Sequence, residues 1–338
     1  MVTTIRTSEG TTVMTRINTS AWTRGGVAVE AGSASEAATQ AGLNWEVETV
    51  PIQAYRNRSV NPYENVTDYF EVPRKQGILR KDTEQVIGVV GEKYKIVQNM
   101  EVFSALDGLV DSGEARYTAA GSYNDGSNVW MIMALPSGVQ VANDPHVAYL
   151  LVQSSHDGSG AVRIRPIIER VFCSNQINKL ITRAKTNDYT YTMKHTTNAK
   201  LSVQDIRNIT QLTYASIQEY ELTADHLLNR EASPQRVRDV FRRVWPLPST
   251  VEGKPYDMLT QGERRQQTLA YAARDKALDI YQNSDTQANI RGTDFGIWQA
   301  VVEYADHHAS GGAERLAVAT LSGRSDKLKS KALELVLA

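Results

Sequence analysis

The sequence predicts an α+β fold: a mostly antiparallel sheet built from hairpins with packed helices, followed by a mainly helical C-terminal region. Short β-rich runs separated by turn residues dominate up to about residue 200. From about Ser202 onward, apolar residues recur with the helical period instead. We therefore divide the 338 residues into a flexible or partly ordered N-terminal segment over 1–42, an α+β core over 43–200 and a helical region over 201–338.

The N-terminal segment is rich in Thr, Ser, Gly and Ala, a composition poorly suited to forming a core. Within it, residues 35–41 favour a short helix capped by Ser33 or Ser35. Residues 43–50 alternate apolar and polar side chains, as a half-buried strand does. Residues 62–73 are interpreted as a loop.

Residues 86–113 predict a compact unit of two strands and a helix. The strands, over 86–90 and 94–96, are joined by a Gly-X turn of the kind that suits hairpins. Asn99 is a suitable N-cap for the helix that follows, and Gly113 suits its end. One face of this helix is apolar and carries Val102, Phe103, Leu106, Leu109 and Val110.

Two further hairpins are predicted, pairing 116–123 with 128–135 and 146–155 with 161–168, because their turns are rich in Asn, Asp, Gly and Ser. We then expect a helix that Ser174 or Asn175 caps. Its apolar face would carry Ile177, Leu180, Ile181 and Ala184. Later helical patterns cover 202–229, 233–244, 260–283, 294–308 and 325–337.

The composition, 41% hydrophobic and 22% charged with a net charge of −1, is that of a soluble globular protein and excludes a uniformly basic molecule. The charge is uneven, since residues 86–150 hold seven acidic and three basic residues, and residues 157–200 hold three acidic and eight basic residues. The second segment suits a polyanion-binding face; the alternative is a solvated surface with internal ion pairs. The single cysteine, Cys173, and the lack of a secretory or membrane-spanning run predict a cytoplasmic protein without membrane contact.

The standard catalytic and nucleotide-binding motifs are missing, so we expect no catalytic residues, no metal and no cofactor. Cys173, Asp188 and His195 have the residue types of a nucleophile, an orienting group and a base. A cysteine that ends an apolar run is, however, more typical of a core. Glu303 and His307 share a helix face, but two ligands do not make a metal site.

Basic and aromatic residues after Val162 carry the main functional hypothesis. Guanidinium groups bind phosphates, and tyrosine rings stack on unpaired bases. The nucleic-acid contacts we expect are Arg163, Arg165, Arg170, Lys179 and Arg183, the stacking residues Tyr189 and Tyr191, and the secondary contacts Lys93 and Lys95. A second basic group follows a helical stretch and comprises Arg230, Arg236, Arg238, Arg242 and Arg243; its alternative is a solvated helix face.

Five segments occur in order along the chain: LNWEV (43–47), VVGEKYKIVQN (89–99), RVFCSN (170–175), KHTTN (194–198) and GTDFGIWQAV (292–301). They resemble a phage/plasmid-like protein family with a domain of unknown function, family 932. The resemblance implies an origin in mobile elements and supplies no activity. The order of hairpin, helix, further antiparallel strands and basic helix is similar, more remotely, to phage single-strand annealing proteins of the RecT and Redβ kind. Those form rings or filaments that hold single-stranded DNA without ATP.

We therefore expect a non-enzymatic phage or plasmid protein that binds single-stranded DNA, promotes annealing or recombination and forms a homo-oligomeric ring or filament. Phage or host replication and recombination proteins are its possible partners. The alternative is a non-catalytic oligomeric interaction module that binds a host or phage protein. Its apolar surface would comprise Trp298, Val301, Val302 and the last helix. A third hypothesis, a metal-dependent enzyme on nucleic acid, needs carboxylates such as Asp82, Glu84 or Asp107 to converge.

Overall fold

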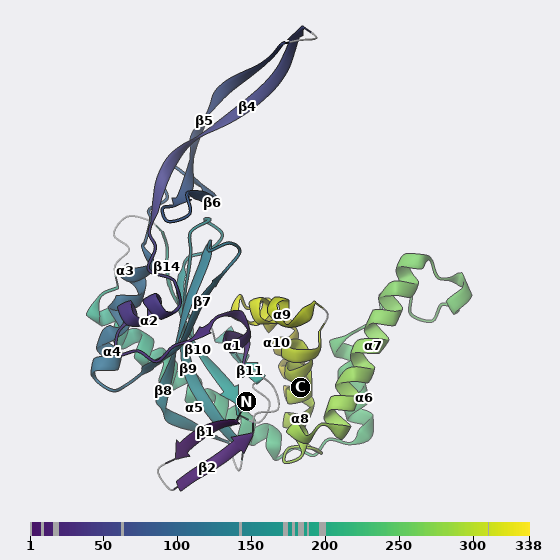
Figure 1. The fold of residues 1–338 in the computed structure, drawn as a ribbon. Coiled ribbons are helices and arrows are strands. Elements are labelled where there is room, and N and C mark those ends of the chain that lie inside the picture. Colours follow the sequence, from purple (N-terminus) through teal and green to yellow (C-terminus); the bar gives the residue numbers. More distant parts are fainter. Residues whose placement is uncertain are drawn as a thin grey trace.

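The computed structural model shows an α+β body from which two arms project, one a β-ribbon and the other a pair of helices (Figure 1). It describes residues 2–7, 10–15, 20–61, 64–141, 144–171, 175–177, 180–181, 186–187, 189–195, 201–309 and 311–338. The predicted fold class is confirmed, because hairpins form antiparallel sheets and helices make up most of the C-terminal region. Within that part of the chain, no helix has both the length and the apolar character needed to cross a membrane.

A seven-stranded sheet forms the centre of the body. Its strands are β3 (Val27–Ala28), β7 (Arg116–Tyr123), β8 (Asn128–Val141), β9 (Asp144–Ser155), β10 (Val162–Arg170), β11 (Asn175–Ile177) and β14 (Tyr191–Met193). The order is β11-β10-β9-β8-β7-β3, with β14 paired to β10, and every pairing is antiparallel. The two predicted hairpins, β7–β8 and β9–β10, are confirmed.

Helices cover both faces of this sheet. One face packs against α2 (Ala34–Gln40), α3 (Asn99–Phe103), α4 (Asp107–Asp111) and the long α5 (Val203–Leu228), and the other against α1 (Ala21–Gly25) and α9 (Gly312–Leu321). Side chains alternate along β10, so Val162 and Ile164 lie in the core on the α5 side, whereas Ile167 lies in the core beside α1 and α9. Apolar burial on both faces therefore holds the strands in register.

The remaining helices pack around α8 (Asp294–Glu303), which continues as a π-helical turn over Tyr304–His308. They are α6 (Pro234–Val244), α7 (Gln261–Asn283) and α10 (Asp326–Leu337), with 3₁₀ turns at Ser104–Leu106, Tyr256–Met258 and Asp285–Gln287. Trp298, Val301 and Val302 are at most 1% exposed in the core that α8 shares with α5, α6 and α10. The apolar surface expected there for an interaction module is therefore wrong.

The β-ribbon arm consists of β4 (Val47–Asn61), β5 (Glu64–Arg80) and β6 (Gln85–Gly91). The loop predicted over 62–73 is wrong for residues 64–73, which pair with β4 in a ladder that places Tyr69 opposite Tyr55. Outside the body and the arm, short hairpins join β1 (Val2–Thr7) to β2 (Gly10–Thr15) and β12 (Leu180–Ile181) to β13 (Thr186–Asn187).

The strand predicted over 94–96 is also wrong, because β6 pairs with β5 and residues 94–98 have no regular secondary structure. Gln98, not Asn99, caps α3, in a capping box with Glu101. The Asn99 amide is used elsewhere, since it donates to the carbonyl oxygen of Leu43 at 3.0 Å and bonds the His156 ring at 2.8 Å. A buried link to distant chain thus overrides the local capping preference.

The helix predicted after Ser174 or Asn175 is wrong over the described residues, which form β11 and β12. The Asn175 side chain donates to the carbonyl oxygen of Gln299 at 3.1 Å rather than to a helix terminus. Residues 175–177 extend the sheet by pairing with 168–170 of β10. Ala184 lies outside the described residues.

Candidate nucleic-acid interface

A polar pocket of about 180 Å³ opens where β7, β8, β9 and β10 end, on the face of the sheet that also carries α9. Strand alternation directs Arg163 to this face, because its neighbours Val162 and Ile164 lie in the core on the α5 side. The pocket is lined by Tyr123, Asn128, Gln153, Ser154, Ser155, Ser159, Gly160, Ala161, Arg163 and Ser322. Hydroxyl, amide and guanidinium groups thus dominate a site built on the ends of rigid strands.

The turn between β9 and β10 is ordered by Asp157, whose carboxylate accepts from the Ser155 hydroxyl at 2.6 Å and the Ser159 backbone N–H at 2.8 Å. Burial alone would raise the pKa of Asp157, but these hydrogen bonds lower it below its usual value. The base of the β-ribbon approaches the same turn. A Cβ on Gly88 would lie 2.5 Å from the Cα of Asp157, so only glycine fits there.

Arg163 lines the pocket, and Arg165 and Arg324 bond to Leu321 and Ser322 at its edge; the three arginines differ in their partners. Arg165 is 11% exposed and is tied to the α9–α10 connection by Asp326 at 3.3 Å and by the carbonyl oxygen of Leu321 at 2.8 Å. Arg163 is exposed and has no carboxylate within ion-pair distance among the described residues. Arg324 is exposed too, and its Nε donates to the Ser322 hydroxyl at 3.1 Å. Arg163 and Arg324 can therefore take an anionic ligand.

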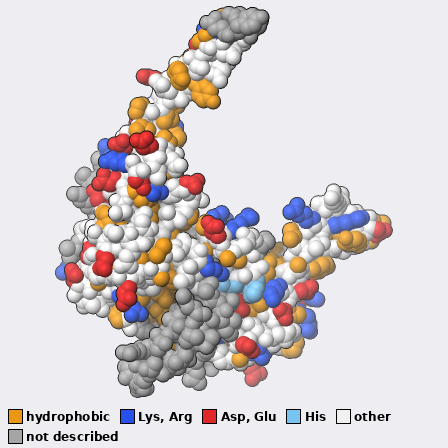
Figure 2. All heavy atoms as spheres, viewed as in Figure 1, with side chains coloured by type: hydrophobic (Ala, Val, Ile, Leu, Met, Phe, Trp, Pro, Cys, Tyr) orange, Lys and Arg blue, Asp and Glu red, His pale blue; other side chains and the backbone are white. Residues whose placement is uncertain are grey.

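Tyr123 lines the pocket, and the three arginines act on the pKa of its phenol. Burial raises the pKa of its phenol above the usual value, with a smaller contribution from Asp157, and Arg165, Arg324 and Arg163 only partly oppose this rise. Each of the three guanidinium groups thus acts on the phenol, although burial outweighs them and keeps it neutral. Figure 2 shows Lys and Arg side chains gathered next to the region of α9 on this side of the molecule.

Lys93 and Lys95 lie on the loop that follows β6, at the same end of the sheet as the pocket. The loop is held there by two hydrogen bonds. The Tyr94 hydroxyl donates to the carbonyl oxygen of Ser155 at 2.9 Å, and the backbone N–H of Lys95 donates to the carbonyl oxygen of His195 at 3.2 Å. Both lysine side chains are exposed. The structure therefore brings the predicted residues Lys93, Lys95 and Arg163 to one end of the sheet.

Arg170 is predicted as a phosphate contact, and the structure contradicts this. Its side chain is 0% exposed and is bound to the Asp144 carboxylate at 2.5 Å. Its other nitrogens donate to the carbonyl oxygen of Thr286 at 2.5 Å and to Asn289 at 2.8 Å. A guanidinium group enclosed by these partners joins β10 to the helical region instead of meeting a ligand.

The two tyrosines lie on the opposite side of the sheet from Arg163. Tyr191 pairs with Ile164 across β14 and β10 and therefore points toward α5, where its hydroxyl bonds Asp205. Burial, followed by this bond, raises its pKa to about 12. The Tyr189 hydroxyl bonds Glu219, also on α5. The structure does not bring these rings to the arginine pocket.

Lys179 and Arg183 lie outside the described residues. In the second basic group, Arg230 and Arg236 bind the fully buried Asp294 at 3.1 and 2.7 Å. The exposed members are Arg238, Arg242 and Arg243; Arg242 pairs with Asp239 at 3.4 Å. This group is therefore divided between a structural ion-pair cluster and a solvated helix face.

The described residues contain no group of three or more His, Cys, Asp or Glu side chains that could hold a metal. His307 bonds Arg24 at 3.1 Å, and His308 lies 3.9 Å from Glu303. Of the carboxylates in the enzyme hypothesis, Asp82 pairs with Arg80, and Asp107 accepts from Tyr117 and from the backbone of Ala34. Cys173 and Asp188 lie outside the described residues.

Tyr123, Gln153, Ser159 and Arg324 also lie at this site and were not predicted from the sequence. Tyr123 ends β7, Gln153 lies in the last part of β9, before Ser155, and Arg324 follows α9. The available signal was the pair of turns at 124–127 and 156–160, because turns at the same end of an antiparallel sheet place their flanking polar residues together.

The molecule is therefore an α+β protein with a pocket suited to anions at one end of its sheet. The chain belongs to the family described as a domain of unknown function (DUF932), whose model matches residues 86–333. The match covers the central sheet apart from β3, the pocket and most of the helical region, and it omits β4 and β5 of the β-ribbon. No curated protein and no solved structure matches the chain.

Proposed function

We propose that this protein binds single-stranded DNA, and that the arginine pocket, defined by Arg163, Arg324, Tyr123, Gln153 and Ser159, holds its phosphate backbone. The observation that carries the proposal is the pair of exposed arginines beside a polar pocket, with the nearby Asp157 already satisfied within its own turn. Guanidinium and hydroxyl groups are the donors that bind phosphate best. The single strand would pass from the pocket toward Lys93 and Lys95.

The biological role that we propose is annealing or recombination of phage or plasmid DNA, without ATP and without catalysis. Backbone contacts on one face of a sheet hold a strand while leaving its bases free to pair. This role is supported by the pocket chemistry and by the remote similarity in the order of elements.

The proposal is tested by titrating labelled single- and double-stranded oligonucleotides at two salt concentrations while particle size is recorded. We expect tighter binding of single strands and a steep loss of affinity as salt rises. The Arg163→Gln variant should bind roughly five-fold more weakly, with a salt slope smaller by about 0.7. Arg165 is unsuitable for this test because its partner is Asp326.

Arg207→Gln is the matched control, since Arg207 is an exposed arginine on α5, on the other side of the sheet. It should leave affinity and salt slope close to those of the wild type. If neither kind of oligonucleotide binds, or if binding is insensitive to salt, the proposal is wrong.

A second function, a non-catalytic oligomeric module that binds a host or phage protein, is favoured by the end of the helical arm. Tyr256, Met258 and Leu269 expose 61%, 68% and 58% of their surface there. Apolar groups gathered at the end of a projecting element are typical of a protein contact. This function requires binding to a protein and no affinity for DNA, so the same titration separates the two.

A further inference from the structure

The β-ribbon exposes aromatic side chains well beyond the body of the molecule. Tyr55 on β4 and Tyr69 on β5 lie directly opposite one another, so both rings stand on one face of the ribbon. They are 68% and 67% exposed, and Phe70, on the opposite face, is 47% exposed. Figure 2 shows hydrophobic side chains, a class that includes Tyr and Phe, along this projection. Rings this open to solvent are free to stack on another flat ring.

The outer part of the ribbon is close to neutral in charge. Residues 53–71 hold two basic and three acidic residues. Arg56 and Arg58 both bind Asp68 at 3.0 Å. The Arg56 guanidinium also lies 5.4 Å from the centre of the Phe70 ring. The outer ribbon therefore offers rings rather than free charge, and contacts made there should depend little on salt.

The base of the ribbon, in contrast, is basic. Its exposed basic residues are Arg74, Lys75, Lys93 and Lys95. In the part of the chain that the structure describes, none of the four has a carboxylate within ion-pair distance. Glu92 is the one acidic residue among 74–75 and 91–95, so these segments carry a net charge of +3. Their charge complements that of a phosphate backbone.

The strand register places the rings a short way beyond the arginine pocket. Pro51 of β4 and Val90 of β6 both lie opposite Gln76 of β5. Val90 packs on the turn between β9 and β10, which borders the pocket, because a Cβ on Gly158 would lie 3.1 Å from its side chain. Tyr55 is four residues beyond Pro51, which is about 13 Å along the strand. A single strand that leaves the pocket would thus cross the basic base and reach the rings.

We propose that the β-ribbon binds the unpaired bases of the single strand, which stack on Tyr55 and Tyr69. The inference rests on the proposed function, because the pocket holds the phosphates of the same strand. These rings take the role expected of Tyr189 and Tyr191, whose hydroxyls bind α5. Stacking accepts any base, since every base has a flat π face. In a duplex those faces are covered by neighbouring bases, so the ribbon favours single strands.

The test compares two single strands of equal length, one with bases and one whose sugars are abasic. Both carry the same phosphates, so only stacking separates them. The wild type should bind the strand with bases about ten-fold more tightly. Tyr55→Leu with Tyr69→Leu should lose most of this preference and keep the salt slope, because no charge changes. Tyr55→Phe with Tyr69→Phe keeps both rings and should keep the preference.

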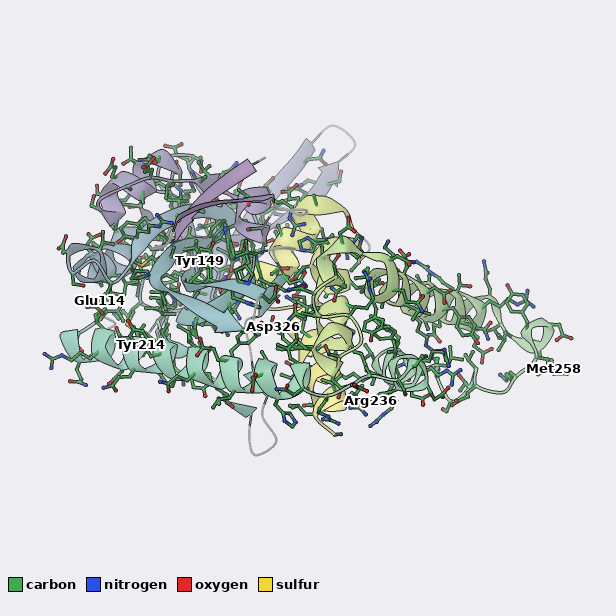
Figure 3. The ribbon with its side chains drawn as sticks, turned by 90° about the horizontal axis from the view of Figure 1, so that it is seen from below. Glu114, Tyr149, Tyr214, Arg236, Met258 and Asp326 are labelled. Carbon is green, nitrogen blue, oxygen red and sulfur yellow. The ribbon has the colours of Figure 1, made fainter. Side chains whose placement is uncertain are left out.

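Tyr214→Leu is the matched control, since Tyr214 is 44% exposed on α5, on the other side of the sheet from the pocket (Figure 3). It should leave the preference for bases unchanged. Circular dichroism and unchanged affinity for the abasic strand will show that the leucine variant is folded. A direct readout of contact is Tyr55→Trp, whose added fluorescence should be quenched by the strand with bases and not by the abasic strand.

Failure of this inference and failure of the proposed function give different results. If the leucine variant keeps the preference for bases while Arg163→Gln still lowers the salt slope, the pocket stands and the ribbon proposal is wrong. If the wild type binds neither strand, both proposals fall. Light scattering without DNA gives the remaining outcome: an oligomer that the leucine variant dissociates would make the rings a contact between copies and overturn their role in stacking.

Discussion

Arg163 and Arg170 lie on the same strand, seven residues apart, yet their surroundings are opposite. Arg163, near the start of β10, is exposed beside a polar pocket, whereas Arg170, at the end of β10, is fully enclosed by Asp144, Thr286 and Asn289. Strand alternation sends the two side chains to different faces of the sheet. Identical side chains on one strand can therefore either lie exposed beside a pocket or join two parts of the fold.

The difference teaches that the number of arginines in a segment says little about its affinity for polyanions. The availability of each arginine depends on whether the folded chain places a carboxylate beside its guanidinium group. Asp144 is 26 residues from Arg170, and Asp294 is 64 residues from Arg230. An arginine such as Arg163, with no such partner among the described residues, keeps its charge available for binding.

The largest effect should follow from removing the enclosed guanidinium. Arg170→Ala leaves the Asp144 carboxylate buried and unpaired, so the free energy of unfolding should fall by about 3–5 kcal/mol. Arg163→Ala should change it by less than about 0.5 kcal/mol. Chemical denaturation of both variants compares the two ends of β10 directly, and equal losses would remove the distinction between them.

A smaller loss is expected at the second buried carboxylate. Asp294→Asn removes the charge that binds Arg230 and Arg236 and should lower the free energy of unfolding by about 2–3 kcal/mol. The loss is smaller than at Arg170 because the two arginine side chains are 28% and 30% exposed and can turn to water. Thermal unfolding of the variant, with Asp239→Asn as an exposed control, measures it.

Acid should destabilise the region around Arg170 through His146. Burial lowers the pKa of His146 to about 4, while the unfolded chain titrates near 6.5. The folded state keeps this imidazole neutral, so stability is present above pH 6.5 and is lost as the pH falls from 6.5 toward 4.

The expected loss from this group between pH 6.5 and 5 is about 2 kcal/mol. Denaturation of the wild type and of His146→Gln across this range isolates the contribution, because an amide does not titrate. A wild-type chain whose pH dependence matches that of the variant would show that His146 is accessible.

The smallest expected effect is a change in the pKa of Tyr123, near the start of β10. Arg324→Gln should raise the pKa of Tyr123 further, since the Arg324 guanidinium acts against the rise caused by burial. Ultraviolet titration of the phenol, compared with Arg207→Gln, detects the change. A pKa of Tyr123 that responds to neither substitution would place Arg324 outside the pocket.

Local sequence patterns predict much of the fold, and they fail where partners come from far along the chain. The hairpins at β7–β8 and β9–β10 and most of the later helices follow from turn residues and apolar periodicity. The β-ribbon is missed because Pro62 and Pro73 near the ends of the segment suggest a loop, although Tyr69 and Phe70 between them favour a strand.

The candidate site is predictable only in part. Arg163 is predicted from its charge and strand position, and Lys93 and Lys95 from their charge; the structure brings all three to one end of the sheet. The burial of Arg170 is not, because its partners Asp144, Thr286 and Asn289 come from a loop and strand on one side and from the helical region on the other. Tyr189 and Tyr191 show the same limit, since their hydroxyls bind residues on α5.

The central claim is that Arg163 and Arg324 hold the phosphates of a single strand. The most direct measurement is the slope of log Kd against log salt for a single-stranded oligonucleotide. It should be made for the wild type, for Arg163→Gln with Arg324→Gln, and for a control with the same charge change, Arg116→Gln with Arg207→Gln. The pocket variant should lose about 1.4 from the slope, and the control close to nothing. Equal slopes for all three proteins would contradict the account.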